Sequence, residues 1–501
     1  FTYFSPYNLI NSKFTTKKDV VAEALYKNGT VLIYVSKAKI YDGTYITDFA
    51  DYIEICPNLE NPDALKYITK LNEYIGASEK DGRDSMMIKM MRKGIVIHHG
   101  SMPLKARLII EEFVNRGFAK ICFSTSTLLQ GVNMPFDIVW ISNFKFDGTD
   151  DEKKLKLKNL IGRAGRNTDF EDRFDYGYVI IEEKNVATFS DRIISQSFIS
   201  PISLLDHELG TLDEDKIDIV EAIKEDTFND DLQLTDTQVE RIRVADIEKD
   251  IKFILDNLII FDKPISAKEY YALENTTRVK IKKSFKNIYT SHLRRGELQP
   301  SEASVLSAAL PILLWQIQGQ SFAQTIALRY VFLTEDVKRR TILRLVKKGE
   351  LTPSEAKSEL EKLTIRYSAA AETLPNKSLK AHGLFPKGTR VSDFEYDKLV
   401  YDTYDYLDKV ISLSLKDPMS AAFALYYSKT GDVRADQLSN YIKFGTSDTK
   451  KIWLVRYGFS FDDIEWIKDY VTKIDESEII FSENVSKLDP DKKKIIERFL
   501  N

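Results

Sequence analysis

The stretch GIVIHHGSMPLKARLIIEEFVNRGFAKICFSTSTLLQGVNMPFDIVWI, residues 94–141, carries the strongest fold signal of this chain. Three short apolar runs punctuate it, at residues 95–97, 119–123 and 138–141, and each is rich in β-branched and aromatic side chains. Continuous apolar runs of this length are typical of strands buried on both faces. Helical spacing between the first two runs falls on Leu104, Leu108, Ile109, Glu112 and Phe113. A strand, a helix and a strand in this order predict a βαβ unit and a parallel sheet.

Polar loops follow the first two predicted strands. His98-His99-Gly100-Ser101 follows the first, and residues 124–127, all serine or threonine, follow the second. Ligands of an open α/β sheet bind at the carboxyl ends of its strands. Hydroxyl groups, a glycine and free backbone N–H groups suit phosphate oxygens, so these loops are candidate phosphate contacts.

A pair of arginines follows the third predicted strand, in Gly162-Arg163-Ala164-Gly165-Arg166. If a helix continues from Leu160, the two guanidinium groups lie on one of its faces. Two planar cations on one face fit a polyphosphate, where arginine stabilises the charge that develops on a transferred phosphoryl group.

Four motifs in this region carry a family resemblance: VLIYVSKAK (31–39), HHGSMP (98–103), TSTLLQGVNMP (125–135) and NLIGRAGR (159–166). In order and spacing they resemble the second RecA-like domain of superfamily-two DExH-box helicases, especially the Ski-type branch. The resemblance covers residues 20–185, and it rests on all four motifs together, because a motif such as GRAGR is weak alone.

The resemblance implies a role for each matching residue. The positions that would contact a nucleic-acid strand are Ser36, His99, Gly100, Thr125 and Ser126. Thr125 would hold a phosphate of the strand along which the helicase moves. Positions that face the nucleotide are Gly131, Asn133, Asn159 and Gly162. Arg163 and Arg166 match the catalytic pair that reaches the γ-phosphate. Asn159 and Asn133 depart from the family pattern, which usually has glutamine at the first position and often aspartate at the second.

Two motifs of such helicases are missing from the sequence. It contains neither Gly-x-x-x-x-Gly-Lys-Ser/Thr nor Asp-Glu-x-His, which the family places in an N-terminal RecA-like domain, and it begins at Phe1. We therefore expect the chain to be the C-terminal part of a longer helicase. ATP and Mg²⁺ would be held largely by the missing domain, so the fragment alone should not hydrolyse ATP.

Composition sets broad limits on the class of protein. The formal net charge is −4, so nucleic-acid binding would depend on local basic surface. Two cysteines are too few for a disulfide framework or a zinc site, and they fit a reducing cytoplasm. No apolar run reaches the roughly 18 residues that a membrane span needs, so no membrane association is expected.

Four regions are predicted along the chain. Residues 1–190 form the second RecA-like domain. Residues 191–300 form a helical connector, for which a winged-helix-like fold is one option, although no β-wing can be identified. Residues 301–390 form a helical bundle whose first helix should be kinked or broken near Pro311. Residues 391–501 form a C-terminal helical domain. The predicted fold is thus an α/β RecA-like parallel-sheet domain followed by a mostly α-helical C-terminal half.

A basic stretch, TRVKIKKSFKNIYTSHLRRG, spans residues 277–296 without any acidic residue. Lys282, Lys283 and Lys286 are candidate phosphate contacts, and the interleaved Phe285 and Tyr289 suit base stacking. A solvated helix face is the competing interpretation.

An aromatic segment near the C-terminus leaves a similar choice open. It contains Trp453, Tyr457, Phe459, Phe461 and Trp466. Because their spacing is mostly helical, core packing is favoured over a strand-stacking platform.

These observations lead to one main hypothesis and one alternative. The chain is the motor half of an ATP-dependent helicase or translocase that grips phosphates of single-stranded or partly duplex nucleic acid, with DNA favoured over RNA. Its helical tail also resembles helicase subunits of antiphage systems such as Hachiman, which work with a nuclease subunit. The alternative is a helicase-like scaffold that binds nucleic acid or a protein without unwinding.

Overall fold

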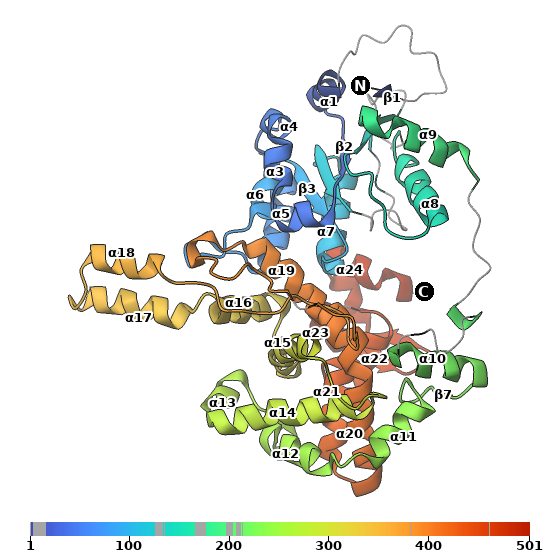
Figure 1. Ribbon diagram of the computed structural model, residues 1–501, viewed down its shortest axis with the longest axis vertical. Coiled ribbons are helices and arrows are strands. Elements are labelled where there is room, and N and C mark those ends of the chain that lie inside the picture. Colours follow the sequence, from blue (N-terminus) through green and yellow to red (C-terminus); the bar gives the residue numbers. More distant parts are fainter. Residues whose placement is uncertain are drawn as a thin grey trace. The chain divides into compact units, whose positions relative to one another are not determined.

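The chain divides into two compact units in the computed structural model (Figure 1). Unit 1 comprises Phe1–Ser203, Ile326–Arg366 and Gly388–Tyr404, and unit 2 comprises Leu204–Thr325, Tyr367–Lys387 and Asp405–Asn501. The structure describes residues 2–3, 17–125, 134, 136–165, 177–196, 204–206, 212, 214–380, 382–459 and 461–500.

A parallel sheet forms the centre of unit 1. Its strand order is β1-β6-β5-β2-β4-β3. The five parallel strands are β2 (Val31–Tyr34), β3 (Ile95–His98), β4 (Ile121–Ser124), β5 (Ile138–Ile141) and β6 (Tyr178–Ile181). At one edge, β1 (Thr2–Tyr3) pairs antiparallel with β6. All four residues of each of β2, β3, β4 and β5 are buried, as expected of a sheet covered on both faces. The predicted α/β parallel-sheet fold is confirmed.

Short helices and crossover helices surround this sheet. They are α1 (Lys17–Tyr26), α2 (Lys37–Tyr41), α3 (Tyr45–Asp48), α4 (Ala50–Ile55), α5 (Pro62–Ile75), α6 (Met86–Met91), α7 (Leu104–Asn115), α8 (Asp150–Ile161) and α9 (Val186–Ile194). Aromatic contacts fasten α3 and the start of α4 to the sheet: the Phe49 ring lies 5.4 Å from that of Phe123 and 4.9 Å from that of Trp140, measured between centroids.

The helix predicted between the first two strands is confirmed as α7, but the sequence misassigned part of its buried face. Leu104 and Leu108 are 60% and 54% exposed. The buried positions are Ala106, Ile110, Phe113 and Val114. Apolar residues occupy more than one face of this helix, so periodicity by itself could not tell which face meets the sheet.

Segments that lie late in the sequence complete unit 1. They are α16 (Phe322–Leu333), α17 (Asp336–Lys347), α18 (Pro353–Glu361) and α19 (Tyr396–Asp405), and α17 and α18 form an antiparallel hairpin (Figure 1). The Tyr396 hydroxyl donates to the Ile75 carbonyl oxygen at 2.7 Å. Asp397 accepts hydrogen bonds from the Ser85 hydroxyl and the Met87 N–H, both at 2.6 Å. The sheet domain therefore includes chain from beyond residue 190.

Unit 2 is mostly helical, which confirms the expected α-helical C-terminal half. Its helices are α10 (Glu214–Glu225), α11 (Asp236–Val244), α12 (Glu248–Leu258), α13 (Ala267–Ala272), α14 (Asn275–Ser291), α15 (Pro300–Ile317), the π-helix Tyr406–Leu415, α20 (Lys416–Thr430), α21 (Val433–Phe444), α22 (Thr449–Arg456), α23 (Phe461–Ile467) and α24 (Pro490–Ile496). Of the two options predicted near Pro311, a break is wrong, because α15 runs through this residue without interruption, and a kink stays a prediction. Leu310, Ile312 and Leu313 are buried around the proline, and this packing offsets the hydrogen bond that proline cannot make.

Three small hairpins accompany these helices. They pair β7 (Phe228–Asn229) with β8 (Leu234–Thr235), β9 (Ile259–Ile260) with β10 (Lys263–Pro264), and β11 (Val471–Ile474) with β12 (Ile479–Phe481). The β9–β10 hairpin follows two helices of the connector, where the sequence revealed no strand pair. The winged-helix-like description of residues 191–300 remains a prediction.

The aromatic segment near the C-terminus contributes to a small core. Phe459 is buried in a cluster with Leu454 and Ile467, and Tyr457 and Trp466 pack against it. This supports the core-packing interpretation for those three aromatic residues. The Phe461 side chain lies outside the described residues.

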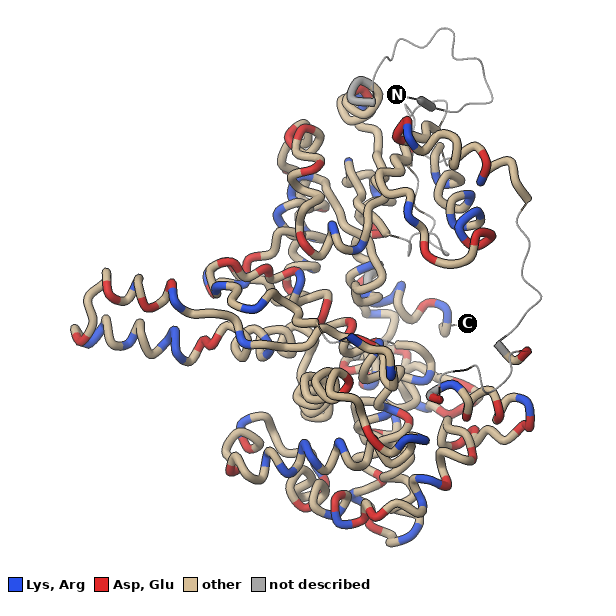
Figure 2. The backbone as a smooth tube through the Cα atoms, in the orientation of Figure 1, with Lys and Arg blue, Asp and Glu red and all other residues tan. Residues whose placement is uncertain are grey.

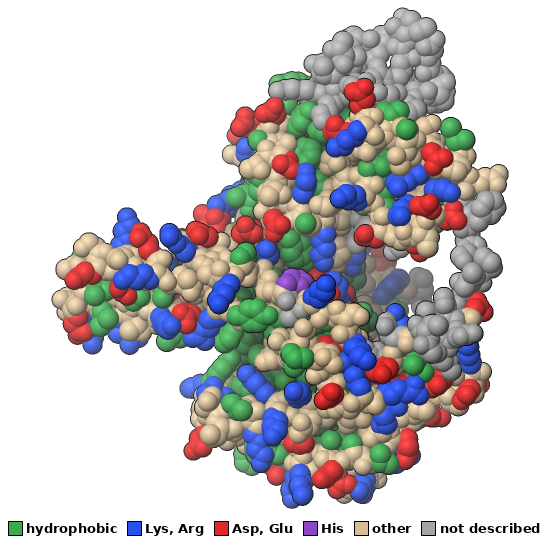
Figure 3. Space-filling view, in the orientation of Figure 1, with side chains coloured by type: hydrophobic (Ala, Val, Ile, Leu, Met, Phe, Trp, Pro, Cys, Tyr) green, Lys and Arg blue, Asp and Glu red, His purple; other side chains and the backbone are tan. Residues whose placement is uncertain are grey.

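The described part of the chain contains no helix that combines the length and the apolar character needed to cross a bilayer. On the visible face of the molecule, acidic and basic side chains are intermixed in both units (Figure 3). This pattern agrees with the near-neutral net charge.

Candidate functional site

The three loops that were predicted to contact a nucleic-acid strand meet where the β-strands have their carboxyl ends. Strands β2, β4 and β3 are neighbours, with Tyr34 paired to Ser124 and Ser124 paired to His98. The Thr125 N–H donates to the His98 carbonyl oxygen at 3.3 Å, and the Val35 N–H donates to the Ser124 carbonyl oxygen at 2.9 Å. The segments that carry Ser36, His99, Gly100 and Thr125 therefore lie side by side, while Ser126 lies outside the described residues.

The His99 side chain is buried beneath this edge rather than open to a ligand. It is 1% exposed, and its Nδ1 accepts a hydrogen bond from the Ser101 N–H at 3.1 Å. The Tyr401 ring of α19 meets it edge-on at a centroid distance of 4.3 Å, and the Tyr41 ring lies 5.8 Å away. The ring thus supports the loop, and the partly exposed Gly100 backbone is the part of the loop that a ligand can reach.

Other residues at the carboxyl ends of these strands are also buried or hydrogen-bonded within the protein. Thr125 is 7% exposed. The half-buried Ser36 accepts a hydrogen bond from the Lys39 N–H at 3.3 Å and so begins α2. His98 is fully buried, with its Nε2 3.1 Å from a carboxylate oxygen of Glu111 on α7. Backbone groups, more than side-chain tips, are thus available at this edge.

Sequence analysis missed the aromatic and acidic residues that support these loops. Tyr41, Tyr401 and Glu111 belong to none of the motifs. Tyr401 lies some 300 residues beyond the loop that it contacts. The position of Glu111 within α7 was the one sequence signal that could have suggested a contact with the preceding strand. No local pattern indicated the position of Tyr401.

The segment that carries the predicted nucleotide-facing residues Asn159 and Gly162 lies at the other end of the β-strands, where their amino ends are. Helix α8 begins with a capping box formed by Thr149 and Glu152 and ends at Ile161, with Gly162 as its C-cap. The Gly165 N–H then donates to the Phe136 carbonyl oxygen at 2.8 Å, and Phe136 and Ala164 form a parallel bridge. Phe136 precedes β5, so this segment lies at the amino end of the strands.

This placement corrects the expectation for the two arginines. Helix α8 ends at Ile161, so the helix that was expected to continue from Leu160 through Arg163 is not formed. Gly162 and Gly165 favour an early end to the helix. Arg166, and likewise Gly131 and Asn133, lie outside the described residues.

The Arg163 side chain faces inward. It is 3% exposed. Burial raises the pKa of the Cys122 thiol in β4, and the nearby Arg163 guanidinium partly opposes that rise. Asn159 on the last turn of α8 and Gly162 are exposed, so these two predicted nucleotide-facing positions are accessible from solvent.

The basic stretch forms α14 in unit 2, and only part of the prediction for it survives. Phe285 and Tyr289 are fully buried, so their expected role in base stacking is wrong. Their spacing matches the buried face of α14, which also contains Ile281 and Ile288 and packs into the helical core.

The three candidate lysines are not among the buried residues of α14. Basic positions recur along this helix (Figure 2). Lys283 and Lys286 are exposed, and burial together with Arg278 lowers the pKa of the half-buried Lys282. Among the described residues, none of these three lysines is paired with a carboxylate. They therefore remain a local basic surface of the kind that the composition requires.

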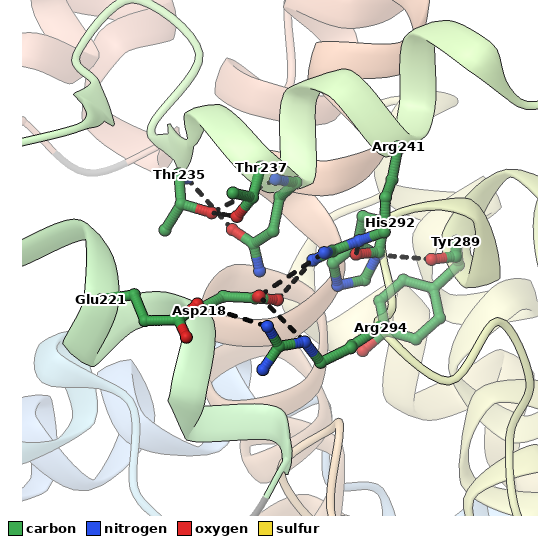
Figure 4. A network of polar contacts seen from close by, with 9 residues as sticks. Asp218, Glu221, Thr235, Thr237, Arg241, Tyr289, His292 and Arg294 are labelled. Carbon is green, nitrogen blue, oxygen red and sulfur yellow. Dashed lines mark hydrogen bonds and ion pairs between the residues drawn. The ribbon is translucent and has the colours of Figure 1, made fainter. Parts of the chain in front are cut away.

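The end of the basic stretch is neutralised within unit 2 (Figure 4). Arg294 approaches Asp218 at 3.7 Å and Glu221 at 3.3 Å. Asp218 also pairs with Arg241, whose Nε donates to the His292 carbonyl oxygen at 2.8 Å. Arg295 pairs with the buried Glu302 at 2.6 Å. These arginines join α10, α11, α14 and α15 and do not add to a phosphate-binding surface.

Comparisons with known proteins relate part of the chain to helicases by sequence. The chain is 30% identical over 166 residues to the Hachiman protein HamB of Bacillus cereus, a match that covers 32% of this chain and 14% of HamB. It is 23% identical over 157 residues to the ATP-dependent DNA helicase Hel308 of Pyrococcus horikoshii, covering 31% of this chain and 21% of that protein. It is 29% identical over 129 residues to the antiviral helicase SKI2 of Saccharomyces cerevisiae, covering 24% of this chain and 10% of SKI2.

No protein-family model matches the chain. Each of these matches covers less than a quarter of the relative's own length. Together they support a relationship to helicases, at modest identity and over part of the chain.

Proposed function

We propose that this chain is the C-terminal motor half of an ATP-dependent nucleic-acid helicase or translocase of the DExH-box, Ski-type branch. The observation that carries the proposal is the meeting of the Ser36, His99 and Thr125 loops at one edge of a parallel sheet. Backbone N–H groups and hydroxyls at such an edge hold phosphates without reading base sequence. Similarity to named helicases supports the same class.

In this proposal, a first RecA-like domain supplies the phosphate-binding loop and most of the contacts to ATP and Mg²⁺. Gly131, Asn133, Asn159 and Gly162 face the nucleotide. Arg163 and Arg166 approach the γ-phosphate, where guanidinium groups stabilise transition-state charge. The exposure of Asn159 and Gly162 fits such a role, and the burial of Arg163 means that its side chain must turn outward when nucleotide binds.

The proposal is tested with Arg166→Ala in the complete protein. ATP turnover should fall by about a thousandfold or more, because the arginine acts on the transferring phosphoryl group. Binding to a single strand should persist, since the strand contacts lie elsewhere. Arg243→Ala, at an exposed arginine of α11, is the control and should leave both properties unchanged. Full turnover in Arg166→Ala would remove the proposed role of the arginine.

A scaffold that binds nucleic acid or protein without unwinding is the second candidate. The inward-facing Arg163 favours it, because a residue at 3% exposure contributes to packing whether or not ATP is used. A scaffold predicts strand binding with no ATP-dependent unwinding in the complete protein. A helicase assay with a partly duplex substrate, with and without ATP, separates the two candidates.

We further propose that the protein acts in the cytoplasm in antiphage defence, on DNA rather than RNA, with a nuclease or other protein subunit as its partner. The match to the Hachiman protein HamB supports this setting. Phage plating on cells that carry the gene should show protection that Arg166→Ala abolishes, and equal plating with both versions would contradict the proposal.

A further inference from the structure

The β9–β10 hairpin of unit 2 has an unusual turn. Ile260 pairs with Lys263, so Phe261 and Asp262 are the two turn residues, with φ values of 48° and 59°. Two successive positive φ values define the turn that tight hairpins favour, and Asn-Gly suits it best. A bulky aromatic residue is strained there, because its Cβ crowds the backbone.

Burial does not compensate this strain. Phe261 is 95% exposed and Ile260 is 48% exposed. The base of the hairpin is anchored: Ile259 and Ile265 are buried, and the Ile265 N–H donates to the Leu258 carbonyl oxygen at 2.9 Å. A well-anchored hairpin thus presents an aromatic ring to solvent from a strained backbone position. Backbone strain that no packing contact of the same residue explains is a marker of functional positions.

The hairpin lies beside the lysine-bearing helix α14. Ser284 and Asn287 of α14 bond the Asp250 carboxylate of α12, and the Lys280 ammonium lies 4.0 Å from the centre of the Phe253 ring. Later residues of α12 thus meet earlier residues of α14, so the two helices are antiparallel. The end of α12, where the hairpin begins, therefore lies beside the first turn of α14.

Exposed cations continue from this point along α14. Lys280, Lys283 and Lys286 follow at successive turns, about 4.5 Å apart along the axis at a rise of 1.5 Å per residue. Lys263 on the hairpin and Lys268 on α13 are also exposed. Acidic groups nearby are Asp262, Glu269 and Glu274. The Glu269 carboxylate caps α13 through Ser266, and the Glu274 carboxylate accepts a hydrogen bond from the Thr276 hydroxyl at 3.3 Å. The ring thus stands at one end of a mainly basic row.

We propose that Phe261 stacks on a base of the nucleic-acid strand whose phosphates are held by the exposed lysines of α14. The inference rests on the proposed function, because it names a base contact for the same strand. Stacking needs only one ring face and tolerates any base, which suits a sequence-independent motor. Other exposed apolar side chains on these elements are Ile260, Tyr271 and Val279. They alternate along the chain with the exposed Lys263, Lys268 and Lys280, and this mixture favours an anionic strand over an apolar protein surface.

The first test measures binding of the full chain to fluorescein-labelled single-stranded DNA and RNA by anisotropy across a salt series. Phe261→Ala should weaken binding about 5- to 20-fold, within the range of one lost base stack. The salt dependence should stay unchanged, because every lysine that holds a phosphate is still present. Phe228→Ala, at a 43% exposed ring on β7, is the matched control and should bind like the unaltered chain.

The second test separates a base contact from a structural role. Replacing Phe261-Asp262 by Asn-Gly supplies the preferred turn and should maintain or raise the melting temperature while strand affinity falls as in Phe261→Ala. Equal affinity in either variant, or a lower melting temperature with Asn-Gly, overturns the inference and leaves the proposed function intact. If the unaltered chain binds no strand in the complete protein, the proposed function and this inference both fail.

Discussion

Tyr401 lies edge-on against the His99 ring, and its hydroxyl donates to the Met87 sulfur at 3.9 Å. The tyrosine is 1% exposed, and burial raises its pKa well above the usual value. It is therefore a neutral packing residue that holds a motif loop in position. Residues of this kind affect a binding edge without contacting its ligand.

Tyr401→Ala should lower the free energy of unfolding by about 3–5 kcal/mol, because it leaves a cavity under the loop. Strand affinity should fall as the loop loses its support. Tyr401→Phe keeps the ring, and its cost should stay below about 1.5 kcal/mol because it removes only one weak hydrogen bond. Urea unfolding and strand binding of both variants check this, and equal loss in both would show that the hydroxyl matters more than the ring.

His292 illustrates a second kind of residue, one whose charge state depends on burial (Figure 4). Its pKa is lowered from 6.5 to about 4, chiefly by burial and also by Arg241, while the hydrogen bond from Nδ1–H to the Tyr289 carbonyl oxygen and the carboxylate of Asp218 act in the opposite direction. The folded state therefore holds this side chain neutral at pH values where the unfolded chain protonates it.

The sign of the pH effect follows from this difference. Between pH 6.5 and 4 the unfolded state binds a proton that the folded state does not, so stability falls as the pH falls, by up to about 3 kcal/mol from this residue. His292→Gln should remove that part of the pH dependence, and His382→Gln, at an exposed histidine, should not. Urea unfolding at about pH 4.5, 5.5 and 6.5 measures the effect. Parallel curves for all three proteins would contradict it.

At the scale of elements, the end of α8 and the start of β6 share a tight contact. A Cβ atom placed on Gly177 would lie 2.3 Å from the Ala164 carbonyl carbon and 2.4 Å from the Gly165 nitrogen. Both are backbone atoms that a rotamer change cannot move. The glycine thus permits residues 164 and 165 to lie beside Phe136, which precedes β5. That contact holds the segment that carries Arg163.

Gly177→Ala should shift this segment or separate it from the sheet. We expect a loss of about 1–3 kcal/mol in stability, as in other overpacked sites, and reduced ATP turnover in the complete protein because Arg163 moves. Thermal unfolding and a crystal structure of the variant test this. An unchanged melting temperature with the Phe136–Ala164 bridge intact would show that the contact is not limiting.

The lysine face of α14 belongs to the same scale, because a row of charges acts together. Reversing Lys282, Lys283 and Lys286 to Glu should weaken strand binding and reduce the slope of log K against log salt by about 1 for each phosphate that is no longer neutralised. The control reverses Lys493 and Lys494, two exposed lysines of α24. If the reversed protein and the control bind alike at every salt concentration, this face of α14 is merely solvated.

At the scale of the molecule, unit 1 is built from three separate segments of chain. Helix α19 contributes Lys398, which pairs with Asp42 at 3.0 Å, and Asp402, which pairs with the buried Arg329 of α16 at 2.7 Å. The Tyr330 hydroxyl donates to the Gly82 carbonyl oxygen at 2.9 Å. The predicted domain of residues 1–190 lacks all of these late segments.

A fragment of residues 1–203 should therefore unfold at a lower temperature than the full chain and bind a hydrophobic dye, because the surface under α19 is uncovered. A peptide of residues 388–404 should raise its melting temperature in proportion to the logarithm of peptide concentration once binding is saturated. Cooperative unfolding without dye binding, and no response to the peptide, would show that the early segment is self-sufficient.

Local sequence was enough to identify the strands of the sheet, their parallel arrangement and the loops that follow them. Buried runs such as residues 95–97 and residues 138–141 are local signals, since the side chains of one segment are enough to mark it as a core strand. The loops after β3 and β4 were also expected at the carboxyl ends of their strands. The pairing of β2 with β4 and of β4 with β3, which the sequence did not predict, brings them together with the Ser36 loop.

Packing between distant segments established the rest, namely which residues support those loops and where the arginine segment lies. The contact of Tyr401 with His99 and the bridge between Phe136 and Ala164 join segments that local periodicity does not relate. The spacing of Ile281, Phe285, Ile288 and Tyr289 marks one apolar face of α14. Burial of that face is settled by its neighbours, because apolar area removed from water is gained only where another element covers it.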